Sequence, residues 1–267
     1  MRLVQTFLVV VVAVLTAAVA IALLNDTDPA EEAIGDETGR EGLIAAIVPV
    51  DAAPDEWNGA GAQVHAAPGA VAVVADPLAG DRPVFRLTVD ESDVYPVTPT
   101  ENPRAQLLTH PAIEVGEEFW LRTSFLLPRD LPPVPGWMSL VSVYGPPFDG
   151  SSPWQMGIRA DELMWQRNAT YDYDVPWRMP LVKGRWVDVL VHQRFASDGW
   201  VEMWIDGERV TFAGGSRRLA MATADASNGA GPNHAKIMQY RQAGMFQTAT
   251  VYFGALRVGA TRASVAD

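Results

Sequence analysis

The stretch GRWVDVLVHQRFASDGWVEMWIDGERV, Gly184–Val210, decides the fold of this chain. Both of its halves alternate between aliphatic residues and polar or aromatic ones, which is the pattern of half-buried strands. Val187, Val189 and Val191 share one face of the first half, because successive side chains of a strand point to opposite sides. We therefore predict two adjacent antiparallel strands whose valines are buried between two sheets.

The opposite face of these two strands mixes aromatic and ionisable side chains. Trp186, His192 and Arg194 lie on it in the first half, and Trp200 and Trp204 continue it in the second. Flat aromatic rings stack on the apolar faces of sugars, while charged neighbours bind hydroxyl and acid groups. This face is either a saccharide-binding surface or the side-chain filling of a curved sheet, and the residues alone leave both interpretations open.

Similar short runs rich in Val, Ile, Trp, Tyr and Phe recur from Asp51 to the C-terminus, separated by Gly, Pro and Asp clusters. No amphipathic helical pattern of convincing length interrupts them. Such spacing is typical of an all-β sandwich or barrel. A segment of about 210 residues suits one large sandwich of a dozen or more strands.

The N-terminus indicates that the chain acts outside the cytoplasm. Residues 7–24, FLVVVVAVLTAAVAIALL, form an unbroken apolar run that fits a signal peptide and a membrane anchor equally well. Arg2 precedes this run and acidic residues follow it, which orients the remainder to the outer side. We expect residues 1–24 to target or tether the chain, residues 25–50 to form an acidic linker, and residues 51–267 to form the sandwich domain.

The composition excludes several classes of chemistry. The chain has no Cys, and therefore no disulfide, thiolate metal site or cysteine nucleophile. Its four His form no metal-binding motif. The formal net charge is −12, and no basic stripe suggests a nucleic acid partner. The segment YDYDVPW, Tyr171–Trp177, reads as a loop that would suit a sugar-binding rim and only weakly a structural calcium ion. We expect no cofactor and a monomer.

Three segments, in their order along the chain, resemble motifs of the concanavalin-like jelly-roll polysaccharide lyases. That group includes heparin lyase I, the glucuronan lyases and the jelly-roll alginate lyases. One of its strands carries Arg-x-Glu, the next Gln-x-His, and a late strand Lys-x-x-x-Tyr, all on the concave face. The corresponding residues here are Arg104 and Gln106 in NPRAQLL, Ser142 and Tyr144 in LVSVYG, and Lys236 and Tyr240 in KIMQYRQ. The resemblance covers roughly residues 80–262 and implies a jelly roll of two antiparallel sheets that acts on an acidic polysaccharide.

Two of these motifs depart from the pattern of the group. Gln106 stands where the glutamate is expected, and Ser142 and Tyr144 replace the Gln and the His of the central motif. In the group, that His assists proton abstraction, and the Gln together with the Arg neutralises the carboxylate of the uronate. The changes affect the chemistry that the resemblance implies and leave the implied fold intact.

β-Elimination in a 4-linked uronate chain needs three kinds of group. The proton at C5 becomes removable only when the adjacent carboxylate is neutralised, for which the resemblance implies Arg104 and Gln106. A base then takes this proton and an acid protonates the leaving oxygen; one tyrosine can do both when they lie on the same side of the sugar. The resemblance implies Tyr240 for this role, with the Lys236 ammonium favouring the phenolate. Strand alternation turns Arg241 to the opposite face.

The leading hypothesis is therefore an extracellular polysaccharide lyase. Its candidate catalytic residues are Tyr240, Lys236, Arg104 and, as a substitute base, Tyr144. Its candidate substrate-binding residues are Gln106, Ser142, His192, Arg194 and Trp204. A non-catalytic, lectin-like module on the same jelly roll is the alternative. A glycoside hydrolase comes third, because it needs two carboxylates about 5 to 9.5 Å apart and the sequence offers no convincing pair.

Overall fold

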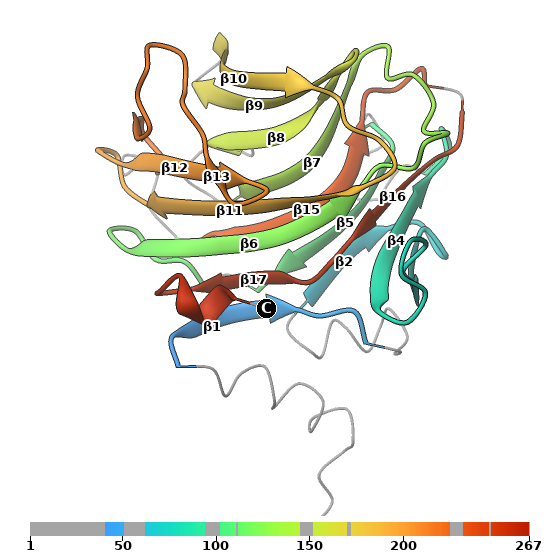
Figure 1. Cartoon of the computed structure of the whole chain (residues 1–267), viewed down its shortest axis with the longest axis horizontal. Helices are drawn as coiled ribbons and strands as arrows, with labels where there is room; N and C mark the ends of the chain where they lie inside the picture. The colour runs from blue at the N-terminus through green and yellow to red at the C-terminus, as the bar shows by residue number, and fades with distance from the viewer. Residues whose placement is uncertain are drawn as a thin grey trace, which may run out of the picture. The chain divides into compact units, whose positions relative to one another are not determined.

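The computed structural model describes residues 41–50, 62–93, 102–110, 112–144, 152–169, 172–224, 232–245 and 247–266. These residues belong to one compact unit, Thr38–Asp267. The unit is a sandwich of two antiparallel sheets, one of ten strands and one of seven (Figure 1). The predicted all-β, two-sheet architecture is confirmed.

The ten-stranded sheet contains the two strands predicted from Gly184–Val210. Its strands are β1 (Leu43–Ile47), β3 (Val71–Ala75), β4 (Pro83–Val89), β6 (Glu118–Leu126), β11 (Trp186–Arg194), β12 (Trp200–Ile205), β13 (Glu208–Arg209), β14 (Leu219–Ala220), β16 (Ala249–Phe253) and β17 (Leu256–Gly259). The main order is β13-β12-β11-β6-β16-β4-β3, and β1 joins through β17, which pairs with β6. A short 3₁₀ helix, η3 (Ala263–Val265), follows β17.

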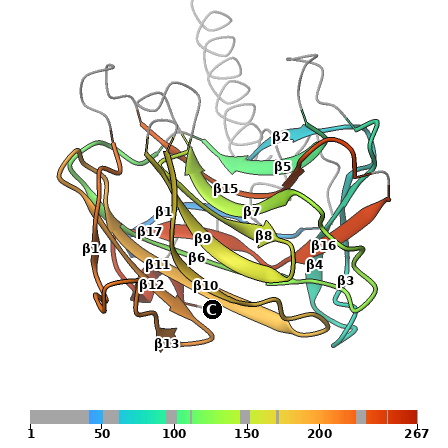
Figure 2. The ribbon, with the colours of Figure 1, turned by 90° about the horizontal axis from the view of Figure 1, so that it is seen from above.

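The seven-stranded sheet carries all three sequence motifs. Its strands are β2 (Ala62–Ala66), β5 (Arg104–Thr109), β7 (Trp137–Tyr144), β8 (Trp154–Arg159), β9 (Glu162–Ala169), β10 (Asp172–Pro180) and β15 (His234–Arg241). They lie in the order β10-β9-β8-β7-β15-β5-β2. The late strand β15 is thus inserted between β5 and β7, which places the three motif strands side by side (Figure 2).

The predicted strand pair forms in the expected register. Val189 of β11 pairs with Ile205 of β12, and Val191 pairs with Met203. Val189 and Val191 are completely buried, as the alternating pattern predicts. The turn after β12 places Asp206 at φ 51° and the next glycine at φ 80°, the left-handed geometry of a type I′ turn.

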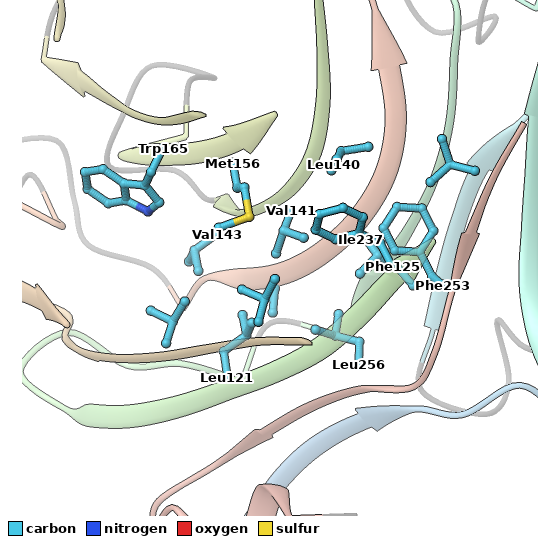
Figure 3. Packing of buried hydrophobic residues seen from close by; sticks show 14 of the residues in the cluster. Leu121, Phe125, Leu140, Val141, Val143, Met156, Trp165, Ile237, Phe253 and Leu256 are labelled. Atoms are coloured by element: carbon cyan, nitrogen blue, oxygen red, sulfur yellow. The ribbon is translucent and has the colours of Figure 1, made fainter. Parts of the chain in front are cut away.

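Apolar side chains from both sheets fill the interior between them (Figure 3). Leu121 and Phe125 of β6 belong to the same buried cluster as Val141 of β7 and Ile237 of β15. Burying a side chain of this size contributes roughly 1.5 to 3 kcal/mol, so this cluster holds the sheets face to face. Residues that alternate with the cluster in the seven-stranded sheet must therefore point away from the ten-stranded sheet.

The predicted boundary of the acidic linker is corrected by β1. This strand falls inside the range 25–50, yet its residues Leu43–Ile47 pair antiparallel with β17. Its sequence, LIAAI, is apolar and Ile47 is buried in the core. The sandwich therefore begins at or before Leu43.

The segment YDYDVPW is a strand over most of its length and not the predicted loop. Asp172–Pro180 forms β10, which pairs only with β9 at the sheet edge, whereas Tyr171 lies outside the described residues. Pro176 lacks a backbone donor, but an edge strand tolerates it, and the register shifts between Asp174 and Trp177. Within the described part of the chain, no group of three or more acidic or His residues is arranged to hold a metal ion.

The described ranges include no helix that is both long and apolar enough to cross a bilayer. The predicted targeting segment, residues 1–24, lies outside them.

Candidate active site on the seven-stranded sheet

A hollow of about 480 Å³ opens on the seven-stranded sheet. Side chains from β7, β8, β9 and β15 line it, and they include two tyrosines, one lysine, one arginine and two glutamines. None of the described residues that line the hollow is Asp or Glu. The carboxylate pair of a glycoside hydrolase is therefore missing from this part of the hollow. The lining is therefore polar, with basic but no acidic side chains among the described residues.

Strand pairing brings the motif residues onto one face of the sheet. Tyr240 pairs with Arg104 across β15 and β5, and Lys236 pairs with Ser142 across β15 and β7. The residues that alternate with Arg104, Ser142 and Lys236 belong to the core cluster, so these side chains point away from the sheet interface. Tyr240 lines the same hollow as Lys236. Arg241, predicted to point the other way, is completely buried, and its Nη1 donates to the Gln247 carbonyl at 2.7 Å.

Tyr240 stands at one end of the hollow, in contact with a guanidinium group. The Cζ atom of Arg104 lies 4.4 Å from the centroid of the phenol ring. The ring of Trp137 packs edge-on against the same phenol, with 4.9 Å between the centroids. Asn102 donates a long hydrogen bond of 3.5 Å from Nδ2 to the phenol oxygen. A cation and a proton-bearing oxygen thus lie together at this end.

Lys236 is deeply buried on the same face, with a relative exposure of 7%. Its Nζ atom lies 4.4 Å from the ring centroid of Tyr144. Burial, and then repulsion from Arg104, lowers the pKa of Lys236 to about 7. The amine contacts the ring of Tyr144, whereas the phenol of Tyr240 contacts Arg104 and Trp137, and Met238 lies between Lys236 and Tyr240 along β15.

Gln106 and Ser142 share this face but lie beneath its surface. Gln106 is 3% exposed and pairs with Met238, and Ser142 is completely buried. The hydroxyl of Ser142 accepts a 3.2 Å hydrogen bond from Ser152. These two candidate binding residues therefore support the floor of the hollow from below.

His65 is a residue of this face that sequence reasoning missed. It pairs with Gln106 across β2 and β5, and its neighbour Val64 packs against the core. Burial, followed by repulsion from Lys236 and Arg104, lowers the pKa of His65. The resemblance to the jelly-roll lyases begins after this strand. The short alternation in AQVHA was the only sequence signal that could have placed His65 on this face.

Gln155 and Gln166 were missed as well, and both line the hollow. They pair with each other across β8 and β9, and Gln155 also pairs with Ser142. Gln155 accepts a 2.9 Å hydrogen bond from Ser139. The two amides extend the polar floor from Lys236 toward the sheet edge, where hydroxyl groups of a bound sugar could find donors and acceptors.

The structure separates three predicted binding residues from this hollow. His192, Arg194 and Trp204 lie on β11 and β12 of the other sheet. The residues that alternate with them, such as Val191 and Met203, fill the core, so the three side chains point outward on the far side of the sandwich. The prediction that they border the same groove is wrong, because alternation assigns a face within a strand but does not reveal which sheet contains the strand.

His192 and Trp204 belong to a separate cluster around Glu202, whereas Arg194 pairs with Asp198. The imidazole of His192 stacks on Trp120 at a centroid distance of 4.0 Å, and Trp204 lies beside Trp120 at 5.4 Å. Glu202, whose side chain is 8% exposed, accepts hydrogen bonds from Arg209 and from other members of the cluster. Burial opposes its ionisation, but hydrogen bonds from Arg218 and His192 outweigh this and hold the pKa of Glu202 below its usual value.

We expect Glu202→Gln to flatten the acid dependence of stability. A carboxylate whose pKa is lowered on folding stabilises the native state above its unfolded pKa of 4.5, and this contribution is lost as the pH falls below that value. Urea midpoints measured over a pH series should thus fall more steeply below pH 4.5 for the wild type than for the variant. Glu118→Gln, at an exposed carboxylate near the same imidazole, is the matched control. Equal slopes for the wild type and Glu202→Gln would contradict the prediction.

The two sheets and the polar hollow define a jelly-roll protein of the kind on which polysaccharide lyases are built. The sequence model of one family, described as Polysaccharide lyase, matches residues 52–257. The chain belongs to the polysaccharide lyase family, and the resemblance stated from the sequence motifs is confirmed.

Solved structures agree with this fold. An endo-β-1,4-glucuronan lyase from the fungus Trichoderma reesei is 17% identical, with a TM-score of 0.56 over 73% of this chain and 88% of that one. Alginate lyase A1-II′, a member of polysaccharide lyase family-7, is 13% identical, with a TM-score of 0.51 over 71% of this chain and 83% of that one. A structure of botulinum neurotoxin type C is 10% identical, with a TM-score of 0.53 over 83% of this chain and 48% of that one. At these identities the similarity shows the jelly-roll fold alone. No curated protein matches the sequence.

Proposed function

We propose that this protein cleaves an acidic, uronate-containing polysaccharide by β-elimination. One observation carries the proposal: in a chain of the polysaccharide lyase family, Arg104 and Tyr240 are in contact at the end of a hollow lined by Lys236. The described lining bears basic side chains and amides but no carboxylate, which favours an anionic glycan over a neutral one.

In the proposed reaction, Arg104 neutralises the carboxylate of the sugar at the cleavage site and makes its C5 proton acidic. Proton transfer breaks the C5–H bond, the electron pair forms the C4–C5 double bond, and the C4–O4 bond breaks. Tyr240 supplies the proton to the leaving oxygen. Where the C5 proton and O4 lie on the same side of the sugar, the phenolate form of Tyr240 first removes the C5 proton. The contact between Arg104 and Tyr240 supports this division of roles, because both groups can face one sugar.

We further propose that the protein acts outside the cytoplasm as a monomer, secreted or tethered through residues 7–24. The apolar run and its charged flanks support this location. Fractionation that recovers the full-length protein in the cytosol would overturn it.

The function is tested by incubating the full-length protein with a panel of polyuronates and glycosaminoglycans. β-Elimination leaves an unsaturated uronate at each new chain end, which is followed by its ultraviolet absorbance. A rise in absorbance with at least one acidic glycan is the expected result. Binding without any such rise would replace this proposal with the lectin-like module, and new reducing ends without unsaturation would favour hydrolysis.

Arg104→Ala is expected to impair binding and turnover together. The guanidinium would pair with the carboxylate in the ground state and more strongly as charge develops in the transition state. Loss of one such stabilising group lowers kcat by about 100- to 1000-fold, and KM should rise as well. Steady-state kinetics on the best substrate measure both parameters. Arg178→Ala removes an exposed cation from the same sheet and serves as the control. An unchanged kcat would contradict the role given to Arg104.

A further inference from the structure

We propose that Lys236 is a second proton acceptor of this site and removes the C5 proton of uronates whose C5 proton and O4 lie on opposite faces of the sugar. Tyr240 then protonates the leaving oxygen from the other side. The inference rests on the proposed function and deepens it, since it states which uronates the site accepts.

The first support is the position of Lys236 relative to Tyr240. Both point to the same face of β15, with Met238 between them, and all three line the hollow. Four residues of strand span about 13 Å at a rise of roughly 3.3 Å per residue. Lysine and tyrosine side chains are long enough to lean toward each other over the intervening methionine. A sugar seated over Met238 would thus meet the amine on one side and the phenol on the other.

The second support is the set of groups that faces the amine. Arg104 on β5, His65 on β2 and His234 on the same strand interact with it or with each other electrostatically, and the ring of Tyr144 on β7 covers it. None of these groups is a carboxylate, and among the described residues no acidic side chain pairs with Lys236. A buried ammonium without an anionic partner is costly. The neutral amine, which carries the lone pair that a base needs, is therefore favoured.

The protonation state of Lys236 follows from this environment. Burial and Arg104 lower its pKa to about 7, so a large share of the amine is free near neutral pH. A general base works best when its pKa lies near the working pH. Lys236 meets this condition and faces the hollow.

The proposed step is balanced without any further reactant. The lone pair of Nζ takes the C5 proton, and the C5–H electrons form the C4–C5 double bond. The C4–O4 bond breaks, and O4 takes the phenol proton of Tyr240. Water then carries the proton from the Lys236 ammonium back to the phenolate. The products are an unsaturated uronate and a new hydroxyl end.

The experiment compares two homopolymers that differ only at C5. In polymannuronate the C5 proton and O4 lie on the same face, and in polyguluronate they lie on opposite faces. Lys236→Met in the full-length protein should lower kcat on polyguluronate by about 100- to 10,000-fold and change polymannuronate cleavage much less. Lys236→Arg should be equally impaired on polyguluronate, because a guanidinium stays protonated.

The pH profile gives an independent readout. Because the base must be deprotonated, the wild-type rate on polyguluronate should rise as the pH increases through about 7, and Lys236→Met should lose this rise. The chain contains only two lysines, so its amines can also be titrated directly by NMR after ¹³C-dimethylation. Lys183→Arg assigns the signals, since that variant retains only Lys236.

Three outcomes overturn the inference. Substantial polyguluronate cleavage by Lys236→Arg would mean that a fixed positive charge suffices, and the proposed function would stand without a lysine base. Titration of the Lys236 signal above about pH 9 would remove the neutral amine, whatever the activity. A wild type that produces no unsaturated uronate from any acidic glycan would overturn the proposed function, and this inference with it.

Discussion

Tyr240→Phe should lower kcat by about 100- to 10,000-fold on every substrate that the protein cleaves, while substrate affinity changes little. The substitution removes the phenol oxygen and nothing else. The ring remains to pack against Arg104 and Trp137. The phenol oxygen gives up only a 3.5 Å hydrogen bond from Asn102, so the local structure has little reason to change. We therefore expect kcat to fall while substrate affinity is retained, which is the result when a group acts mainly in the transition state.

The inactive variant also supplies its own binding test. Because Tyr240→Phe should consume the glycan at least about 100-fold more slowly, its affinity for the intact polymer can be measured by calorimetry and compared with the KM of the wild type. Tyr252→Phe on the other sheet removes a phenol remote from the hollow and should leave kcat unchanged. If Tyr240→Phe retained more than about a tenth of the wild-type kcat, Tyr240 would not be the proton donor.

The hairpin and the two-sheet fold were predictable because alternation of apolar and polar residues within each strand is a local feature of the sequence. Alternation in β11 and β12 fixed which residues are buried, and Val189 and Val191 are indeed fully buried. The strand LIAAI was missed because it follows an acidic segment, and the composition of that segment dominated the interpretation of the whole range. Its pairing with β17, far along the chain, carries no local signal.

The candidate site was predictable only in part, since it depends on contacts between distant strands. The order of the motifs predicted that Arg104 and Tyr240 would share a face, and they pair directly across β5 and β15. Alternation could not show that Trp204 belongs to the opposite sheet. Lys236 lies on β15 between β5 and β7, with Arg104 on β5 and the ring of Tyr144 on β7 near its amine, so no pattern within one strand could reveal its lowered pKa.

Trp154→Ala should cause the largest loss of stability among the substitutions considered. Trp154 lies on β8, is completely buried and stacks near Trp165 with 5.8 Å between the ring centroids. Its indole Nε1 donates a 2.6 Å hydrogen bond to Oε1 of Gln193 on β11, which joins the two sheets through the core. Removing a buried tryptophan costs about 3 to 5 kcal/mol. The orphaned amide oxygen adds about 1 to 3 kcal/mol, because a buried acceptor that loses its donor is left with its desolvation cost uncompensated.

This loss approaches the whole stability of an ordinary domain, about 5 to 15 kcal/mol. Trp154→Phe separates its two sources, since it retains most of the ring volume but removes the donor, and it should cost about 1 to 3 kcal/mol. Urea unfolding of both variants measures the difference. Because Gln155 follows Trp154 in the same strand and lines the hollow, a loosened β8 should also raise KM in the alanine variant. A cost below about 2 kcal/mol for Trp154→Ala, or equal costs for the two variants, would show that the link between the sheets is not what stabilises the floor of the site.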